Sequence, residues 1–128
     1  MLIAKKTVLI TGANRGIILP GYSISKAAAL SLTQSLRTLL TRQGVGVHAV
    51  ITGSVDTDMN RADIPKVSPE SAAVGILDGL ERGEEDIFPE PMSQSIADGW
   101  RAGVAKALER RINAVVLEGA AVDVHERL

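Results

Sequence analysis

Short apolar runs, each ended by a turn-forming pair or a proline, punctuate this chain. Residues 7–10 and 45–51 are rich in β-branched and apolar side chains, and Thr-Gly follows directly on each run. Such runs predict strands that are buried on both faces of a sheet. Residues 86–89 form a third, shorter run, whose flanking acids and Pro89 suit a strand at the edge of a sheet.

Between these runs the apolar positions recur at the spacing of amphipathic helices. Over residues 22–43 leucines repeat about every four positions, and Gly44 follows as a helix-ending residue. A second helix is expected over 69–82, because Ser68 can cap its first turn. A third helix is expected over 93–118.

Strand, helix and strand in succession predict a βαβ unit with parallel strands. We therefore expect an α/β fold with three layers, in which the strand near 7–10 pairs directly with that near 45–51. The strand near 86–89 would lie beyond them. One domain over 1–118 would hold these elements, with 119–128 as a C-terminal tail.

Composition narrows the possible partners. The 128 residues carry a net charge of −1 and one residue each of tryptophan, tyrosine and phenylalanine, which argues against nucleic-acid binding. No cysteine is present and the two histidines are distant, so we expect no metal site. The sequence shows neither a secretory signal nor an apolar run of membrane-spanning length, so we expect a cytoplasmic protein without membrane contact.

A glycine-rich segment, TGANRGI over residues 11–17, follows the first predicted strand. Its glycines let the backbone turn tightly and approach a pyrophosphate, and a following helix would direct unpaired N–H groups at the phosphates. An ordinary glycine turn leaving a strand has the same residues. Both interpretations stay open on this segment alone.

A tyrosine and a lysine stand four residues apart at the start of the first predicted helix. This spacing puts Tyr22 and Lys26 on one helix face. The lysine charge there favours the phenolate, which makes the phenol usable for proton transfer near neutral pH. Alternatively, Tyr22 packs on the core and Lys26 is solvated.

These two motifs and the segment GSVDTDM over 53–59 resemble, in the same order, three signatures of the short-chain dehydrogenase/reductase family. The likeness covers residues 7 to about 112. It implies a reduced Rossmann-like fold and an oxidoreductase that uses NADP(H). The implied reaction is hydride exchange between NADP(H) and a small carbonyl or alcohol.

The resemblance also assigns residues to the cofactor's adenosine-phosphate and pyrophosphate end. These residues would be Gly12, Asn14, Arg15, Gly16 and Ile17. Arg15, directly before the second glycine, resembles the arrangement in family members that prefer NADP, where a cation meets the 2′-phosphate.

The remaining family roles fall on the two later motifs. Tyr22 would transfer the proton, while Lys26 would assist it and hold the nicotinamide ribose. Val55 and Thr57 would hold the carboxamide of the nicotinamide ring.

The chain departs from the family pattern between the first two motifs. Only five residues separate Gly16 from Tyr22, whereas the family has several strands and helices there. Ile18 replaces the third glycine, and the position of the family's catalytic serine falls within the first strand. These departures predict an internally truncated domain that lacks this serine and part of the cofactor site.

Two functions therefore stay open. The first is NADP(H)-linked oxidoreduction through Tyr22 and Lys26. The second is a non-catalytic, oligomeric interaction module. In either case we expect a homo-oligomer, because the leucine-rich helix over 22–43 would otherwise leave an apolar stripe uncovered.

Overall fold

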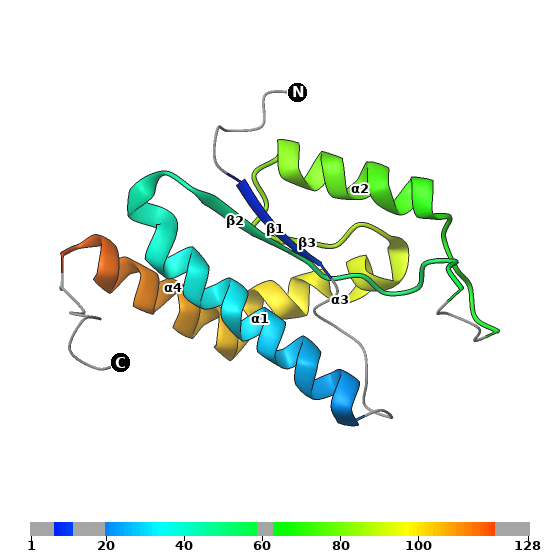
Figure 1. Cartoon of the computed structure of the whole chain (residues 1–128), viewed down its shortest axis with the longest axis horizontal. Helices are drawn as coiled ribbons and strands as arrows, with labels where there is room; N and C mark the ends of the chain where they lie inside the picture. Colours follow the sequence, from blue (N-terminus) through cyan, green and yellow to red (C-terminus); the bar gives the residue numbers. More distant parts are fainter. Residues whose placement is uncertain (1–6, 12–19, 59–62, 120–128) are drawn as a thin grey trace.

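The structure is a computed structural model that describes residues 7–11, 20–58 and 63–119. Its elements are β1 (Thr7–Thr11), α1 (Pro20–Leu40), the 3₁₀ helix η1 (Thr41–Gln43), β2 (Gly46–Val50), α2 (Pro69–Glu81), β3 (Asp86–Ile87), α3 (Pro91–Ala102) and α4 (Val104–Leu117). Figure 1 shows them as a small sheet enclosed by helices. No helix within these ranges is long and apolar enough to cross a membrane.

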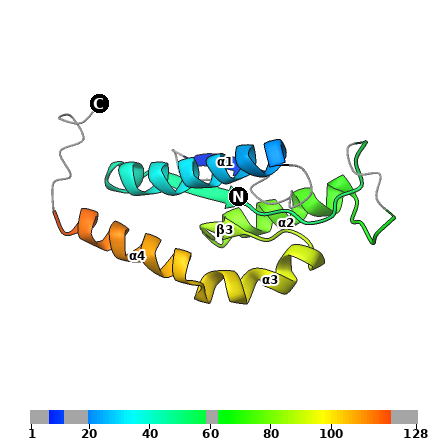
Figure 2. The same ribbon diagram turned by 90° about the horizontal axis from the view of Figure 1, so that it is seen from below.

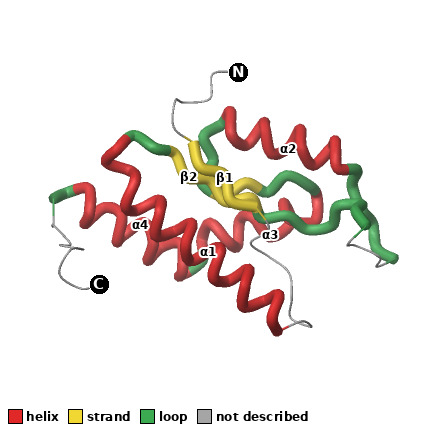
Figure 3. The backbone as a smooth tube through the Cα atoms, in the orientation of Figure 1, coloured by secondary structure: helices red, strands yellow, loops and turns green. Residues whose placement is uncertain are grey.

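The described strands form one parallel sheet in the order β1-β2-β3. β1 pairs with β2 along its whole length, and β3 pairs with Ala49 and Val50 of β2. Figure 3 shows the strands in yellow between the helices. The predicted pairing of the first two runs, with the third beyond them, is confirmed.

The sheet lies between two helical layers. α2 covers one face, while α1 and α4 lie on the other (Figures 1 and 2). The two residues of β3 show this alternation, because Asp86 contacts Arg37 of α1 and Ile87 lies against Gly79 of α2. The predicted reduced, three-layer Rossmann-like unit is confirmed.

Most helix ends follow the sequence signals. Ser68 accepts a hydrogen bond from Ser71 N at 3.1 Å and so caps α2, as predicted. Gly44 adopts the left-handed φ of 67° that ends η1. α1 begins at Pro20 rather than Tyr22, since proline is tolerated in a helix's first turn.

The single helix predicted over 93–118 is wrong, because this segment forms two helices. Gly103 separates α3 from α4 with an extended backbone at φ −70° and ψ 156°. The break allows Trp100 of α3 to pack on the buried cluster of Ile51 and Phe88. It also allows α4 to direct Lys106 toward the sheet, and these contacts outweigh helix continuity at a residue of low helix propensity.

A buried polar network joins α1 and α4 to the sheet. Arg37 donates to the carbonyl oxygens of Val47 at 3.0 Å and Glu85 at 2.8 Å, and it pairs with Asp86 at 3.0 Å and with Glu109. Both carboxylates are about as buried as the guanidinium. Arg37 thus neutralises charges from two other elements.

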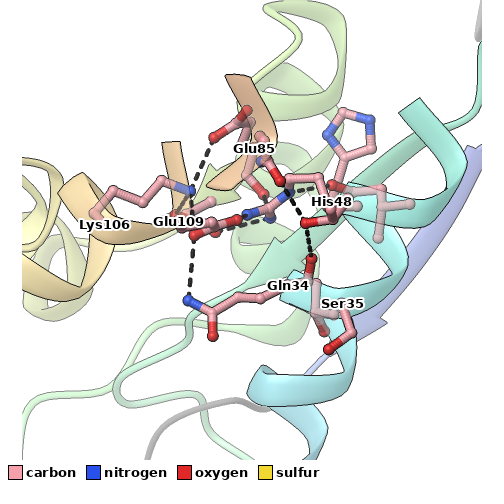
Figure 4. A network of polar contacts seen from close by, with 12 residues as sticks. Gln34, Ser35, His48, Glu85, Lys106 and Glu109 are labelled. Atoms are coloured by element: carbon pink, nitrogen blue, oxygen red, sulfur yellow. Dashed lines mark hydrogen bonds and ion pairs between the residues drawn. The ribbon is translucent and has the colours of Figure 1, made fainter. Parts of the chain in front are cut away.

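Lys106 is the second cation of this network (Figure 4). Its Nζ lies 2.8 Å from Asp86, 3.0 Å from Glu109 and 2.9 Å from Glu85. Trp100 Nε1 donates to Asp86 at 2.9 Å. Burial favours the neutral acid, but hydrogen bonds from Lys106 and Trp100 and the charge of Arg37 hold the pKa of Asp86 below its ordinary value.

Candidate functional site

The first turns of α1, which carry the predicted catalytic residues Tyr22 and Lys26, lie on the side of the sheet on which the strands end. Because the strands are parallel, β1 and β2 end on the same side, and the first turn of α1 lies there too (Figures 1 and 2). In open α/β sheets, ligands bind outside this edge. The segment 53–58, which follows β2, starts from the same edge.

Tyr22 and Lys26 lie together in the first turns of α1. Lys26 Nζ is 5.2 Å from the centroid of the Tyr22 ring, and both side chains are half-buried. Ser25 Oγ donates to the Tyr22 carbonyl at 2.8 Å. The helical spacing therefore brings the lysine charge to the phenol ring, as the sequence predicts.

The segment after β2 is fixed through its backbone. Val55 forms a parallel bridge with Val67, in which Val67 N donates to Ser54 O at 3.1 Å and Asp56 N donates to Val67 O at 2.9 Å. Val55 is half-buried and Thr57 is exposed. The two residues predicted to hold the carboxamide are thus accessible on an anchored segment.

Glu90 is a buried carboxylate at this edge that the sequence reasoning missed. Its side chain accepts hydrogen bonds from Gly53 N at 2.6 Å, Met92 N at 2.7 Å and Ser93 N at 2.8 Å. Burial opposes ionisation, but the hydrogen bonds from Ser93, Met92 and Gly53 keep the pKa of Glu90 below its ordinary value. The acid before Pro91, with a serine three positions later, is the capping signal that would have revealed it.

The predicted phosphate-binding residues lie outside the described part of the chain. They are Gly12, Asn14, Arg15, Gly16 and Ile17. The structure therefore brings Tyr22 and Lys26 together and puts the segment carrying Val55 and Thr57 at the same edge. The family role of each of these residues stays a prediction.

A second feature is an open groove of about 470 Å³ between α1 and α4. Leu39, Leu108 and Ile112 line it and are 53%, 58% and 48% exposed. Its lining also includes Gln34, which donates to Glu109 at 3.2 Å. This groove lies over the buried polar network, away from Tyr22 and Lys26.

Comparison with known proteins identifies similar chains. Residues 10–67 match a protein family described as short chain dehydrogenase. This range contains Tyr22, Lys26, Val55 and Thr57, so it includes both described motifs.

One similar protein, short chain dehydrogenase ple7 of Rhodocybe pseudopiperita, is 29% identical over 114 residues, covering 84% of this chain and 42% of that protein. A second is the crystal structure of a short chain dehydrogenase from Burkholderia cenocepacia J2315 in complex with NADP. It aligns with a TM-score of 0.66 and 32% identity, over 83% of this chain and 46% of that chain. This chain thus spans less than half the length of each of these two proteins.

Proposed function

From the similarity of this chain to short-chain dehydrogenases, we propose that it exchanges hydride between NADP(H) and a small carbonyl or alcohol. The observation that carries the proposal is the position of Lys26 over the Tyr22 ring at the carboxyl edge of the sheet. A cation beside a phenol is an arrangement suited to proton transfer.

The residues at this edge fit the nicotinamide half of the cofactor. Thr57 is exposed and offers a hydroxyl, and Val55 lies on a backbone segment held by its bridge to Val67. An anchored segment loses little conformational entropy when it binds a ligand. The similar chain from Burkholderia cenocepacia was solved with NADP, which supports the same cofactor here.

When bound, NADPH would supply the hydride that adds to the carbonyl carbon. Tyr22 would donate its phenolic proton to the carbonyl oxygen, so that an alcohol forms and a phenolate remains. Lys26 would stabilise this phenolate through its positive charge. In the opposite direction Tyr22 would accept the alcohol proton.

The adenosine-phosphate and pyrophosphate end of the cofactor would be bound by residues of the glycine-rich segment. Arg15 would meet the 2′-phosphate of NADP(H), and Gly12 and Gly16 would allow the backbone to approach the pyrophosphate. The substrate partner would be a small molecule.

Carbonyl-dependent oxidation of NADPH tests the role of Tyr22. The Tyr22→Phe variant should still bind NADPH but lose about 10²- to 10⁴-fold in turnover, the usual contribution of a general acid. Ser35→Ala, at an exposed position further along α1, is the matched control and should retain activity. Undiminished turnover in Tyr22→Phe would remove the role proposed for this residue.

The second candidate function is a non-catalytic oligomeric module. The observation that favours it is the set of exposed apolar side chains lining the groove between α1 and α4, among them Leu39 and Leu108. Under this alternative the chain sediments as an oligomer, Leu108→Glu dissociates it, and no NADPH is consumed. A wild-type chain that sediments as a monomer would remove this alternative.

A further inference from the structure

The carboxylate of Glu90 connects the start of α3 to the end of β2. Its Oε1 accepts from both Gly53 N at 2.6 Å and Ser93 N at 2.8 Å, and its Oε2 accepts from Met92 N at 2.7 Å. The residue is only 2% exposed. A buried carboxylate with three backbone donors is held in one orientation, because each donor is itself fixed in the fold.

We propose that Glu90 is a positioning residue, which fixes the segment 53–57 in the geometry that holds the nicotinamide half of NADP(H). This inference rests on the proposed function. Glu90 would touch neither cofactor nor substrate. It acts through the backbone of Gly53, two residues before Val55 and four before Thr57.

The close approach of Glu90 to Gly53 depends on the glycine. A Cβ atom at position 53 would lie 2.4 Å from Glu90 Oε1 and 2.9 Å from Met92 Cβ, closer than real Cβ contacts. The missing side chain thus leaves room for the carboxylate to reach the amide directly. Gly53 and Glu90 form a complementary pair.

The segment has a second tether further along. Val67 holds Ser54 O and Asp56 N through the parallel bridge at Val55. Glu90 fixes the entry to the segment, and Val67 fixes its middle. With the entry released, the segment would have to be ordered by the cofactor, which would weaken binding of the half of the ligand that it contacts.

Glu90→Gln tests the proposal, because the amide keeps the size of the side chain but loses one acceptor oxygen and the negative charge. We expect the Kd for NADP⁺ to rise about tenfold or more, as for a lost hydrogen bond to a charged group. The Kd for 2′,5′-ADP, which lacks the nicotinamide half, should stay unchanged. A general loss of structure would weaken both ligands equally and would overturn the proposal.

Ser93→Ala is the matched control. Ser93 Oγ donates to Glu90 O at 3.0 Å within the same helix cap, so this variant perturbs the cap but keeps the Gly53 hydrogen bond. Its Kd for NADP⁺ should equal that of the wild type. Equal weakening in Ser93→Ala and Glu90→Gln would assign the effect to the helix cap and contradict the proposal.

Amide hydrogen exchange without nucleotide separates this inference from the proposed function. The Gly53 amide should exchange at least about tenfold faster in Glu90→Gln than in the wild type. Unchanged exchange would show that Glu90 does not hold the segment, whatever the cofactor does. If exchange accelerates but the wild type binds no NADP(H), the tether stands, while the proposed function and the positioning role that rests on it both fail.

Discussion

The buried polar network and the carboxyl edge of the sheet use charge in opposite ways. In the network Arg37 and Lys106 are 5% and 3% exposed and are paired with Asp86 and Glu109. At the carboxyl edge Lys26 is half-buried and lies over an aromatic ring. The network thus fully satisfies its charges, whereas the edge leaves a cation and a phenol accessible to a ligand.

The buried polar network thus stabilises the fold, whereas the accessible pair at the carboxyl edge would carry the proposed chemistry. Removal of one partner from a buried ion pair leaves a desolvated, uncompensated charge, which strongly destabilises a protein. A partly exposed pair contributes little to stability and remains available for reaction. Substitutions in the two regions should therefore affect different measurements.

The largest effect is expected for Arg37→Met. The variant removes one of the two buried cations that Asp86 and Glu109 share, and leaves Lys106 alone beside both carboxylates. We expect the free energy of unfolding to fall by about 3–5 kcal/mol in urea denaturation. Arg82→Met, at a pair that is exposed to solvent, should change it little. Equal free energies of unfolding in Arg37→Met and Arg82→Met would contradict the special contribution of the buried network to stability.

A smaller loss is expected where α2 contacts the sheet. A Cβ atom at Gly79 would lie 2.5 Å from Ile87 Cγ2, so Gly79→Ala must displace the helix or the strand. The expected destabilisation is about 1–3 kcal/mol. Gly99→Ala is the control, because a Cβ there meets nothing within 4 Å and should stabilise α3 by about 0.5–1 kcal/mol. Thermal unfolding checks this, because the midpoint should fall in Gly79→Ala and rise in Gly99→Ala.

Acid should weaken the fold through Asp86 and Glu90. Both carboxylates have a folded-state pKa below their ordinary values of 3.8 and 4.5, so they bind protons more weakly when folded. Their stabilising contribution is present above those values and is lost as the pH falls through the lower folded-state pKa values. Asp86→Asn should reduce this pH dependence, and the exposed Asp98→Asn should not. Identical acid profiles in both variants would contradict the assignment.

The smallest effect on stability is expected at the carboxyl edge. Lys26→Met keeps an unbranched side chain, one atom shorter, and removes the ammonium group over Tyr22. The free energy of unfolding should change by less than about 0.5 kcal/mol, while NADPH turnover falls strongly. A large loss of stability would show that Lys26 is structural.

The regular elements were predictable because their signals are local. The apolar runs at 7–10 and 45–51 form paired strands, and Ser68 caps α2 as its sequence context indicates. The strand at 86–89 is shorter than expected, ending at Ile87 two residues before Pro89, which has no N–H to donate to a sheet.

The polar network could not be predicted in the same way. Arg37 lies on a helix with many leucines, and its partners are 49 and 72 residues away in the chain. Only tertiary contact shows that this arginine is buried. The same contacts break the predicted helix 93–118 at Gly103. Of the predicted site, the pair Tyr22 and Lys26 follows from helical spacing alone.

The proposed function requires that this chain binds NADP(H) at the carboxyl edge of its sheet. Titration of the purified chain with NADPH, followed by nicotinamide fluorescence, tests it most directly, with Arg15→Ala as the paired variant. We predict saturable binding that weakens in Arg15→Ala, because this residue would meet the 2′-phosphate. A wild-type chain that shows no saturable binding would contradict the proposed function.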